Sequence, residues 1–449
     1  AFAAYGLKVG NINYDTTSKV MWGEYRTWNH LEDYGEEVSY IAIDFGYSKD
    51  KRNDKKQIKI GLGTTNGIVT DAKVLSGNTD DKTYNKENLE DLDRLLKTMK
   101  VDRDDFYYIA DSALFSATNI EKANQNGIQF ITRMPDNTKL ARQLLATALP
   151  EEAQLVEIEN ARGTAVSYEL IETEVLYNEY QCKAAVVYSH ALKETKQKST
   201  NKKVGKEQQK VTRSIKKYKK RTFKCRPDAE KEIELLHKKL GSKLKFHELE
   251  FEINELKIRR PGRPSKNPED DIARIEFQLV VTVVLNEDNV AEELRKQCTF
   301  ILCSNDLALS GAKMLREYKT QSDVEKRFRN LKSPKYMNSV FLKTPKRVEA
   351  VIYLLLIGLM LLTIAEMVVR EGLKRTNDLV YGIERRKQKR PTLTSILQIM
   401  ERIQVVTYSE NGKPRRIVRS IDESCLKIIS FLGFTVSDFA WEEDGFDSS

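Results

Sequence analysis

The sequence is poor in the residues that build structural metal sites and disulfide frameworks. Its 449 residues include four histidines and five cysteines, and no two cysteines stand in a C-x-x-C spacing. This composition argues against a structural zinc site, and scattered thiols are typical of a reducing compartment. The first stretch, AFAAYGLKVGNINYD, lacks an initiator methionine and the apolar core of a signal peptide. We therefore expect a cytoplasmic chain that begins inside a longer protein.

The sequence also lacks an apolar run of comfortable membrane-spanning length. The longest such run covers 350–365 and is flanked by Glu349 and Glu366. A membrane helix needs about 20 apolar residues, so this run is short for that purpose. We predict a helix buried inside the protein and no membrane partner; a membrane span is the alternative interpretation.

Neither sign of charge is scarce, but the positive sign exceeds the negative. The chain has 75 Lys and Arg against 66 Asp and Glu, which gives a net charge of +9. A basic excess over a chain of this size favours an anionic partner, most commonly a nucleic acid. A basic soluble protein without such a partner is the other interpretation. The length predicts two or three domains of roughly 100–200 residues each.

Four stretches differ in pattern, and together they predict an α/β protein with a mixed sheet flanked by helices. Residues 1–136 alternate strand and helix patterns, with strands expected around Asp15 and over 40–48 and a hairpin at Thr65-Asn66-Gly67. Residues 137–297 are rich in strand patterns and basic residues, and we expect a largely β insertion there. Residues 298–375 contain two helical patterns, and residues 376–449 predict a helix, a hairpin at Asn411-Gly412 and a second helix.

Two basic segments of the middle stretch are candidate DNA contacts. The first contains Lys216 and Lys217 within a strongly cationic run, which suits an arm that follows phosphates; a solvated helix face or loop is the alternative. The second is RRPGRPSK, in which Arg260 and Arg263 flank Pro261. Arginines on an extended proline-containing segment can enter the minor groove, although Pro261 stands where an AT-hook has an arginine. A plain basic turn is equally compatible with this segment.

Acidic residues at strand ends are the candidate catalytic groups. Asp15 lies in a predicted strand, Asp111 ends a later one, and Glu325 lies on a predicted helix. A lone buried carboxylate is costly, so such acids point into clefts more often than into cores. Three converging carboxylates suit two Mg²⁺ or Mn²⁺ ions about 4 Å apart, which would activate a nucleophile and stabilise the leaving oxygen at phosphorus. Asp44 is a rival for the place of Asp15.

The segment from Glu317 to Lys332 has no Gly or Pro, and we predict a single helix there. The offsets within it place one aromatic, one amide, one acid and two cations along one face, namely Tyr318, Gln321, Glu325, Arg329 and Lys332. Such a face can hold a metal ligand next to groups that contact a DNA strand.

At these residues the chain resembles a known family. The spacing Tyr318-x2-Gln321-x3-Glu325-x6-Lys332 is similar to the Y-x2-R-x3-E-x6-K pattern of DDE transposases of the bacterial IS-four superfamily. The segments GYSKDKRNDKKQ, SGNTDDKTY and ADSALFSATNI resemble blocks of its sixteen-thirty-four-type branch. The resemblance extends over nearly the whole chain.

The resemblance implies an RNase H-like catalytic core interrupted by a largely β insertion, with Asp15, Asp111 and Glu325 as the catalytic triad. It implies metal-dependent cleavage and strand transfer on double-stranded DNA by a homodimer in a synaptic complex. The chain departs from the family pattern in three ways: Gln321 replaces an Arg, Lys51 and Asn53 replace a His and a Pro, and an N-terminal DNA-binding domain is absent or shortened. A nuclease of the same fold and an inactive DNA-binding derivative are the alternatives.

Overall fold

The computed structural model describes residues 5, 9–25, 31–33, 36–38, 40–103, 106–146, 153–159, 164–261, 272–410 and 413–439. The chain divides into two compact units. Unit 1 comprises Ala1–Pro135, Thr173–Ala184 and Leu302–Ser449, and unit 2 comprises Asp136–Glu172 and Ala185–Ile301. The domain boundaries expected from the sequence stay a prediction.

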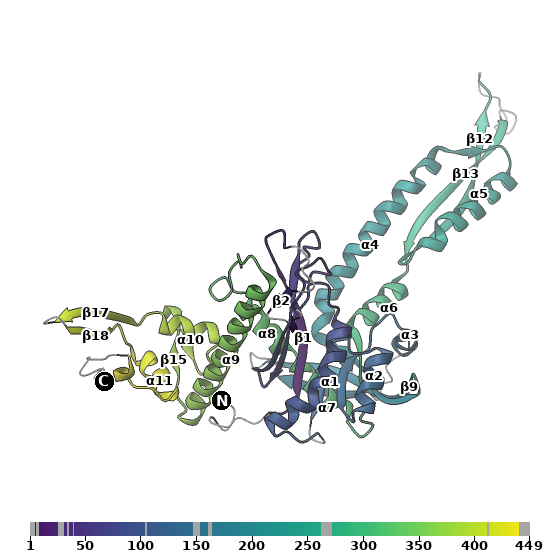
Figure 1. Cartoon of the computed structure of the whole chain (residues 1–449). Coiled ribbons are helices and arrows are strands. Elements are labelled where there is room, and N and C mark those ends of the chain that lie inside the picture. The colour runs from purple at the N-terminus through teal and green to yellow at the C-terminus, as the bar shows by residue number, and fades with distance from the viewer. Residues whose placement is uncertain are drawn as a thin grey trace. The chain divides into compact units, whose positions relative to one another are not determined.

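A nine-stranded mixed sheet is the largest element of the described structure (Figure 1). The strand order is β5-β4-β1-β6-β7-β14-β10-β9-β8. In that order the strands are Ile68–Leu75, Gln57–Thr65, Ile12–Val20, Tyr107–Ala110, Gln129–Arg133, Thr299–Ser304, Tyr180–Ser189, Ala165–Tyr177 and Gln154–Glu159. The prediction of a mixed α/β architecture is thus confirmed.

The first part of the sheet combines antiparallel and parallel pairing. Strands β1, β4 and β5 form an antiparallel meander; β6 pairs parallel with β1, and β7 pairs parallel with β6. The β4–β5 hairpin turns at Asn66 and Gly67, whose φ angles are 50° and 77°, as a two-residue turn with left-handed backbone requires. The predicted hairpin is confirmed. The strand expected over 40–48 is reduced to a single bridge between Asp44 and Gln57.

The helices of unit 1 connect and cover these strands. They are α1 Asp81–Met99, α2 Ala117–Gln125, α7 Gly311–Lys319, α8 Ser322–Leu331, α9 Pro345–Arg375, α10 Leu393–Met400 and α11 Glu423–Phe431. The side chains of Asp80 and Ser116 accept backbone hydrogen bonds at the N-termini of α1 and α2. Gly127, with a φ of 63°, follows the C-terminus of α2.

The single helix expected from Glu317 to Lys332 is wrong, because the chain forms two helices that meet at Thr320 and Gln321. The Thr320 hydroxyl donates to the backbone oxygen of Glu317 at 2.6 Å and also bonds the Asn13 side chain. A hydroxyl that competes for a helical carbonyl disturbs the regular ladder, and here a tertiary partner holds it in place. Tyr318 and Glu325 therefore lie on successive helices.

Helix α9 is the one described helix whose length and composition would allow it to cross a membrane, which is weak evidence for a span. One of its faces packs on β5 and α8 (Figure 1). Ile352, Leu356 and Leu359 join Val324 and Phe328 of α8 in a common core cluster. The predicted packing of the apolar segment beside the Glu325 helix and against the sheet is confirmed. The expected burial of the whole segment is wrong, because Leu354, Ile357 and Leu361 on its other side are 67%, 51% and 55% exposed.

A buried ion cluster fixes α8 to α9 and to the β4–β5 turn. Arg327 of α8 is 6% exposed and Glu366 of α9 is 2% exposed, and their charged atoms lie 2.5 Å apart. Glu366 also pairs with Arg370 at 2.5 Å and accepts a hydrogen bond from the Leu393 backbone. The Arg327 Nε donates to the backbone oxygen of Gly67. The buried charges of Arg327 and Glu366, from two different helices, thus neutralise each other in the core.

Unit 2 contains a three-stranded sheet in the order β11-β13-β12, formed by Thr222–Phe223, Ile272–Leu285 and His247–Arg259. Its helices are α3 Lys139–Ala146, α4 Lys193–Ile215, α5 Arg226–Lys239 and α6 Glu287–Cys298. Leu236 of α5 packs with Tyr218, Phe223 and Leu279 in a small core. The insertion expected to be largely β therefore carries substantial helix as well, because the cationic run forms α4.

The C-terminal segment follows the predicted helix–hairpin–helix order. Strands β17 Gln404–Glu410 and β18 Lys413–Arg419 pair between α10 and α11. The turn residues Asn411 and Gly412 lie outside the described residues. Ile396, Cys425 and Ile428 pack against Val369 and Leu373 of α9, so this segment shares the core of that helix.

The buried ion cluster predicts a large stability loss on removal of one partner. We expect Arg327→Met to lower the free energy of unfolding by about 3 kcal/mol, because Glu366 loses its second cation inside the core. Urea denaturation followed by circular dichroism measures this change. The matched control is Arg329→Met, on the same helix but exposed, for which we expect a change within about 0.5 kcal/mol. Equal effects in both variants would contradict the importance of the cluster.

Candidate active site

Two of the predicted acids are placed side by side by the sheet. Strands β1 and β6 are parallel neighbours, with Tyr14 paired to Ala110. The next residue on each strand is Asp15 and Asp111. Because neighbouring strands lie about 4.8 Å apart, continued register brings the two residues to adjacent positions at one edge of the sheet. Asp111 directly follows the end of β6, as expected, whereas Asp15 is the fourth of the nine residues of β1 and does not lie at a strand end.

The alternation of β1 separates a polar face from a buried one. Tyr14 points into the core, where its ring stacks on Tyr108 at 4.5 Å. Asn13 and Asp15 lie on the opposite face, as the period of two requires. Asn13 donates to the Thr320 hydroxyl at 2.9 Å, and the neighbouring Asn11 donates to Glu317 at 2.7 Å. The junction between α7 and α8 is thereby fixed two residues from Asp15.

A lysine that we did not select from the sequence is the positive centre of this face. The Lys49 ammonium lies 2.8 Å from Asp15 and 3.4 Å from Asp81, and donates to the backbone oxygen of Thr16 at 2.7 Å. Burial by itself would lower the pKa of Lys49, but the charges of Asp15, Asp81 and Asp111 raise it. The lysine is therefore held as a cation by the acids around it.

Asp81, at the first position of α1, completes this group of charges. It accepts a hydrogen bond from the Thr16 hydroxyl at 2.6 Å and lies 3.3 Å from the Lys59 ammonium. Burial would raise the pKa of Asp81, but Lys49, Thr16 and Lys59 outweigh it and hold this pKa below its ordinary value. Asp81 and Lys49 come from the segments SGNTDDKTY and GYSKDKRNDKKQ, so the block pattern was the signal that could have selected them.

The other two acids are shifted in the opposite direction. Burial is the main cause that raises the pKa of Asp15, against the lowering effect of Lys49. Burial also raises the pKa of Asp111, and the negative charge of Asp15 adds to the rise. Two neighbouring carboxylates with raised pKa values favour the approach of a further cation.

Tyr318 connects the helical acid to this pair. Burial raises the pKa of its hydroxyl to about 12; Arg133 opposes the rise, whereas Asp111, Asp15 and Glu325 contribute to it. The charges of all three predicted acids therefore act on this hydroxyl. Glu325 is exposed on the first turn of α8.

The close cluster expected for two metal ions is not formed. Within the described part of the chain, no three His, Cys, Asp or Glu side chains are gathered so as to hold a metal ion. The physical reason lies at Asp15, where the Lys49 ammonium already occupies one carboxylate oxygen. The donor chemistry itself fits a hard cation, since carboxylate oxygens are the ligands that Mg²⁺ accepts. The carboxylates of Asp44 and of its rival Asp15 each accept a hydrogen bond from the next backbone N–H, so the choice between them stays a prediction.

The predicted DNA-contacting residues are distributed over both units. Gln321 directly precedes α8, Arg329 is exposed on it, and Lys332 follows it and pairs with Asp50 at 2.7 Å. In unit 2, Lys216 and Lys217 are exposed in a short 3₁₀ helix after α4. Arg260 is exposed just after β12, and Arg263 lies outside the described residues.

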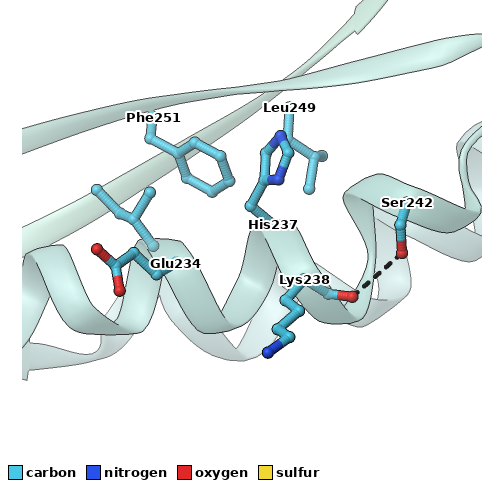
Figure 2. A pocket seen from close by; sticks show the side chains of 7 residues that line it. Glu234, His237, Lys238, Ser242, Leu249 and Phe251 are labelled. Atoms are coloured by element: carbon cyan, nitrogen blue, oxygen red, sulfur yellow. Dashed lines mark hydrogen bonds between the residues drawn. The ribbon is translucent and has the colours of Figure 1, made fainter.

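A cavity in unit 2 contains none of these residues. It has a volume of about 550 Å³ and lies between α5 and β12. Figure 2 shows the rings of His237 and Phe251 on its wall, and the Ser242 hydroxyl donates to the Lys238 backbone oxygen at its end. Its lining combines three apolar residues with Glu234, His237, Lys238 and Ser242, and none of the predicted site residues belongs to it.

One of three comparisons with known proteins is informative about the family of this chain. The family model of the transposase DDE domain matches residues 29–361, a range that contains Asp111 and Glu325 and begins after Asp15. No curated protein matches the chain. A solved structure of the piggyBac transposase synaptic complex with hairpin DNA is similar at 9% identity and a TM-score of 0.32, over 83% of this chain. The chain spans about half of that protein, 49%, and so low a likeness carries no argument.

The charge arrangement predicts a specific response to divalent cations. We expect Lys49→Met to lower the stability of the protein by about 1–3 kcal/mol in metal-free buffer, because the acids around it lose their cation. Addition of Mg²⁺ should raise the melting temperature of this variant more than that of the parent.

Differential scanning fluorimetry with and without Mg²⁺ measures both effects. Lys86→Met, at an exposed position of α1, is the matched control and should respond as the parent does. A variant as stable as the parent and indifferent to Mg²⁺ would show that the acids do not form a cation site.

Proposed function

The chain belongs to the transposase DDE domain family, and from that membership we propose that it cuts DNA at the ends of an insertion sequence and joins the freed ends to a target. The observation that carries this proposal is the register of β1 and β6, which brings Asp15 and Asp111 to adjacent positions of one sheet. Asp15 and Asp111 come from adjacent parallel strands, and Glu325 comes from a helix fixed to the same face. We further assign the chain to the sixteen-thirty-four-type branch of the IS-four superfamily.

We propose that residues 1–136 and 298–375 form an RNase H-like core, with 137–297 as its insertion and 376–449 as a C-terminal region. Support comes from the strand order, in which an antiparallel meander continues into two parallel strands. Parallel neighbours bring their carboxyl ends to one edge of a sheet, which is where two acids can share a substrate. The apolar segment 350–365 serves as a core helix in this proposal, without a membrane partner.

In the proposed reaction the chain's own residues position a DNA strand at the two sheet acids. Mg²⁺ or Mn²⁺, as a pair of ions, would be held by Asp15, Asp111 and Glu325 and would activate the attacking oxygen and stabilise the leaving one. Lys49 keeps the carboxylates of Asp15 and Asp81 ionised and close together when substrate is absent. Tyr318, partly buried beside the acids, packs against a sugar or base of the bound strand.

Cations beyond the acids orient the DNA. Arg329 and Lys332 follow Glu325 along α8 and its end, and we propose that both contact the backbone of the element end. Lys332 must exchange its partner Asp50 for a phosphate, which is feasible because that pair is partly exposed. Gln321 provides a neutral contact where the family pattern has an Arg. The protein would act as a homodimer in the cytoplasm, associated with the nucleoid.

The basic surface of unit 2 is proposed to bind DNA without reading its sequence. Lys216 and Lys217 are exposed, and the Lys217 ammonium lies 4.8 Å from the centre of the Tyr218 ring. Tyr218 belongs to the small core of the unit, so the two lysines have a rigid base. Arg260, and Arg263 after it, would contribute contacts from the end of β12.

The mechanism predicts that Glu325 is required for cutting and not for binding. We expect Glu325→Gln to reduce cleavage of element-end DNA by at least about a hundredfold, since loss of a metal ligand removes stabilisation of the developing charge. Binding in a gel-shift assay should stay within about twofold of the parent. Glu371→Gln, an exposed acid on α9, is the matched control and should cut normally.

Comparison with Lys332→Ala sharpens this test, because removal of a phosphate contact should weaken binding and cleavage in parallel. If Glu325→Gln cuts at the parent rate, α8 is not part of the active site and the transposase mechanism fails. Cleavage by the parent without joining of the freed end to a target would identify a nuclease instead.

The basic surface of unit 2 predicts a change in salt dependence. We expect Lys216→Gln with Lys217→Gln to flatten the slope of log affinity against log salt by about one unit for each lost phosphate contact. Fluorescence anisotropy with labelled duplex at several salt concentrations measures the slope. The control pair is Lys86→Gln with Lys97→Gln on α1. An unchanged slope would make Lys216 and Lys217 ordinary solvated residues.

A further inference from the structure

Two large aromatic side chains are exposed around a second cavity, in unit 1. Trp22 follows β1 and is 48% exposed, and Phe45 precedes the loop that carries Lys49 and is 52% exposed. Both line a cavity of about 430 Å³ together with Met21, Lys55 and Lys56, and two acids, Glu24 and Asp54, complete its wall. We call this cavity the Trp22 pocket. Its volume lies within the range of about 300–1,000 Å³ that is usual for ligand sites.

The ring faces in the Trp22 pocket lie close to cations. The Lys55 ammonium is 5.1 Å from the centre of the Trp22 ring, and the Arg52 guanidinium is 5.8 Å from it. The Lys56 ammonium is 6.0 Å from the centre of the Phe45 ring. Of the two wall acids, Asp54 is already neutralised by Arg52 at 2.8 Å. The pocket therefore offers flat apolar faces with positive charge beside them.

The wall of the Trp22 pocket is fixed by the backbone. Met21 donates its backbone N–H to the Lys56 oxygen at 2.9 Å, and Asp44 and Gln57 exchange two backbone hydrogen bonds. The Lys56 ammonium binds the backbone oxygens of Glu24 and Tyr25. Lys56 is therefore structural. Lys55 can turn towards a ligand, and Arg52 can do so by exchanging Asp54 for a phosphate, because that ion pair is exposed. A preformed wall lowers the entropy cost of binding.

The Trp22 pocket is joined to the candidate active site by two short segments. Asp15 and Trp22 are seven residues apart along β1 and its extension, or about 23 Å at 3.3 Å per residue. Lys49 and Lys55 belong to one loop, which contacts Asp15 at one end and the pocket at the other. A DNA strand bound at the acids can therefore reach the pocket within about seven nucleotides, at 3.4 Å per nucleotide.

We propose that the Trp22 pocket binds the base of an unpaired nucleotide, which stacks on Trp22 and packs against Phe45 while Arg52 and Lys55 contact its flanking phosphates. The flat rings select a flat ligand and the cations select an anionic one, and a nucleotide combines both properties. A base within a duplex is already stacked on its neighbours, so the pocket takes a strand that has been separated. The location of this nucleotide on cleaved DNA depends on the proposed transposase function, but the binding itself does not.

Oligonucleotides with and without bases test this inference on the full chain. We expect Trp22→Leu to weaken binding of a dT oligonucleotide about five- to a hundredfold, as loss of one stacking partner does. Binding of an abasic oligonucleotide of equal length should change by less than about twofold, because it retains the phosphates. Phe341→Leu, at an aromatic residue that is 77% exposed and outside the pocket lining, is the matched control.

A second measurement does not depend on the loss of Trp22. The chain has three tryptophans, and replacement of Trp28 and Trp441 by Phe leaves Trp22 as the sole fluorophore. The dT oligonucleotide should quench this emission and the abasic one should not. No quenching, or equal loss of dT and abasic binding in Trp22→Leu, overturns the proposal. The outcome is independent of the Glu325→Gln cleavage assay, so failure of either proposal can be recognised separately.

Discussion

The pairing of Arg327 with Glu366 inside the core is the interaction on which the rest of unit 1 depends. It neutralises two charges that would each be costly out of water, and it does so between α8 and α9. Arg327 also binds the Gly67 oxygen, where the left-handed turn presents a free carbonyl. A side chain added at residue 67 would lie 3.0 Å from the guanidinium, so glycine serves both the turn and the close approach. The orientation of Glu325, two residues before Arg327, follows from this anchor.

In the candidate active site, too, a cation offsets the repulsion between acids. Asp15, Asp81 and Asp111 are close enough to influence one another, and Lys49 offsets their repulsion. The lysine belongs to a loop rather than to the sheet, and its backbone N–H holds that loop to the Ser18 hydroxyl of β1 at 2.9 Å. A site of this kind stays folded without a metal ion and still has carboxylates to offer to one.

Local patterns were sufficient for many elements and insufficient where distant residues decide. The strand around Asp15, the Asn66-Gly67 turn and the packing of α9 on the sheet each follow from neighbouring residues, and the structure agrees with them. The break at Thr320 depends on Asn13, which is 307 residues away, and no window of sequence contains both. The role of Lys49 could not be predicted from its neighbours for the same reason, because its partners Asp15 and Asp81 come from β1 and α1. The cationic run forms α4, with Val211 and Ile215 buried, and the choice between a phosphate-following arm and a solvated face stays open.

The contact between Arg327 and Gly67 also constrains how the protein can fold. It joins residues 260 positions apart, and both segments of unit 2 lie in the intervening chain. Closing a loop of this length costs entropy that only later contacts recover, so such contacts form late. During synthesis the β4–β5 hairpin is made first, and its contact with Arg327 can form only after α8 has been made. Unit 2 can complete its own core in that interval, and the catalytic helix then docks as one of the last events of folding.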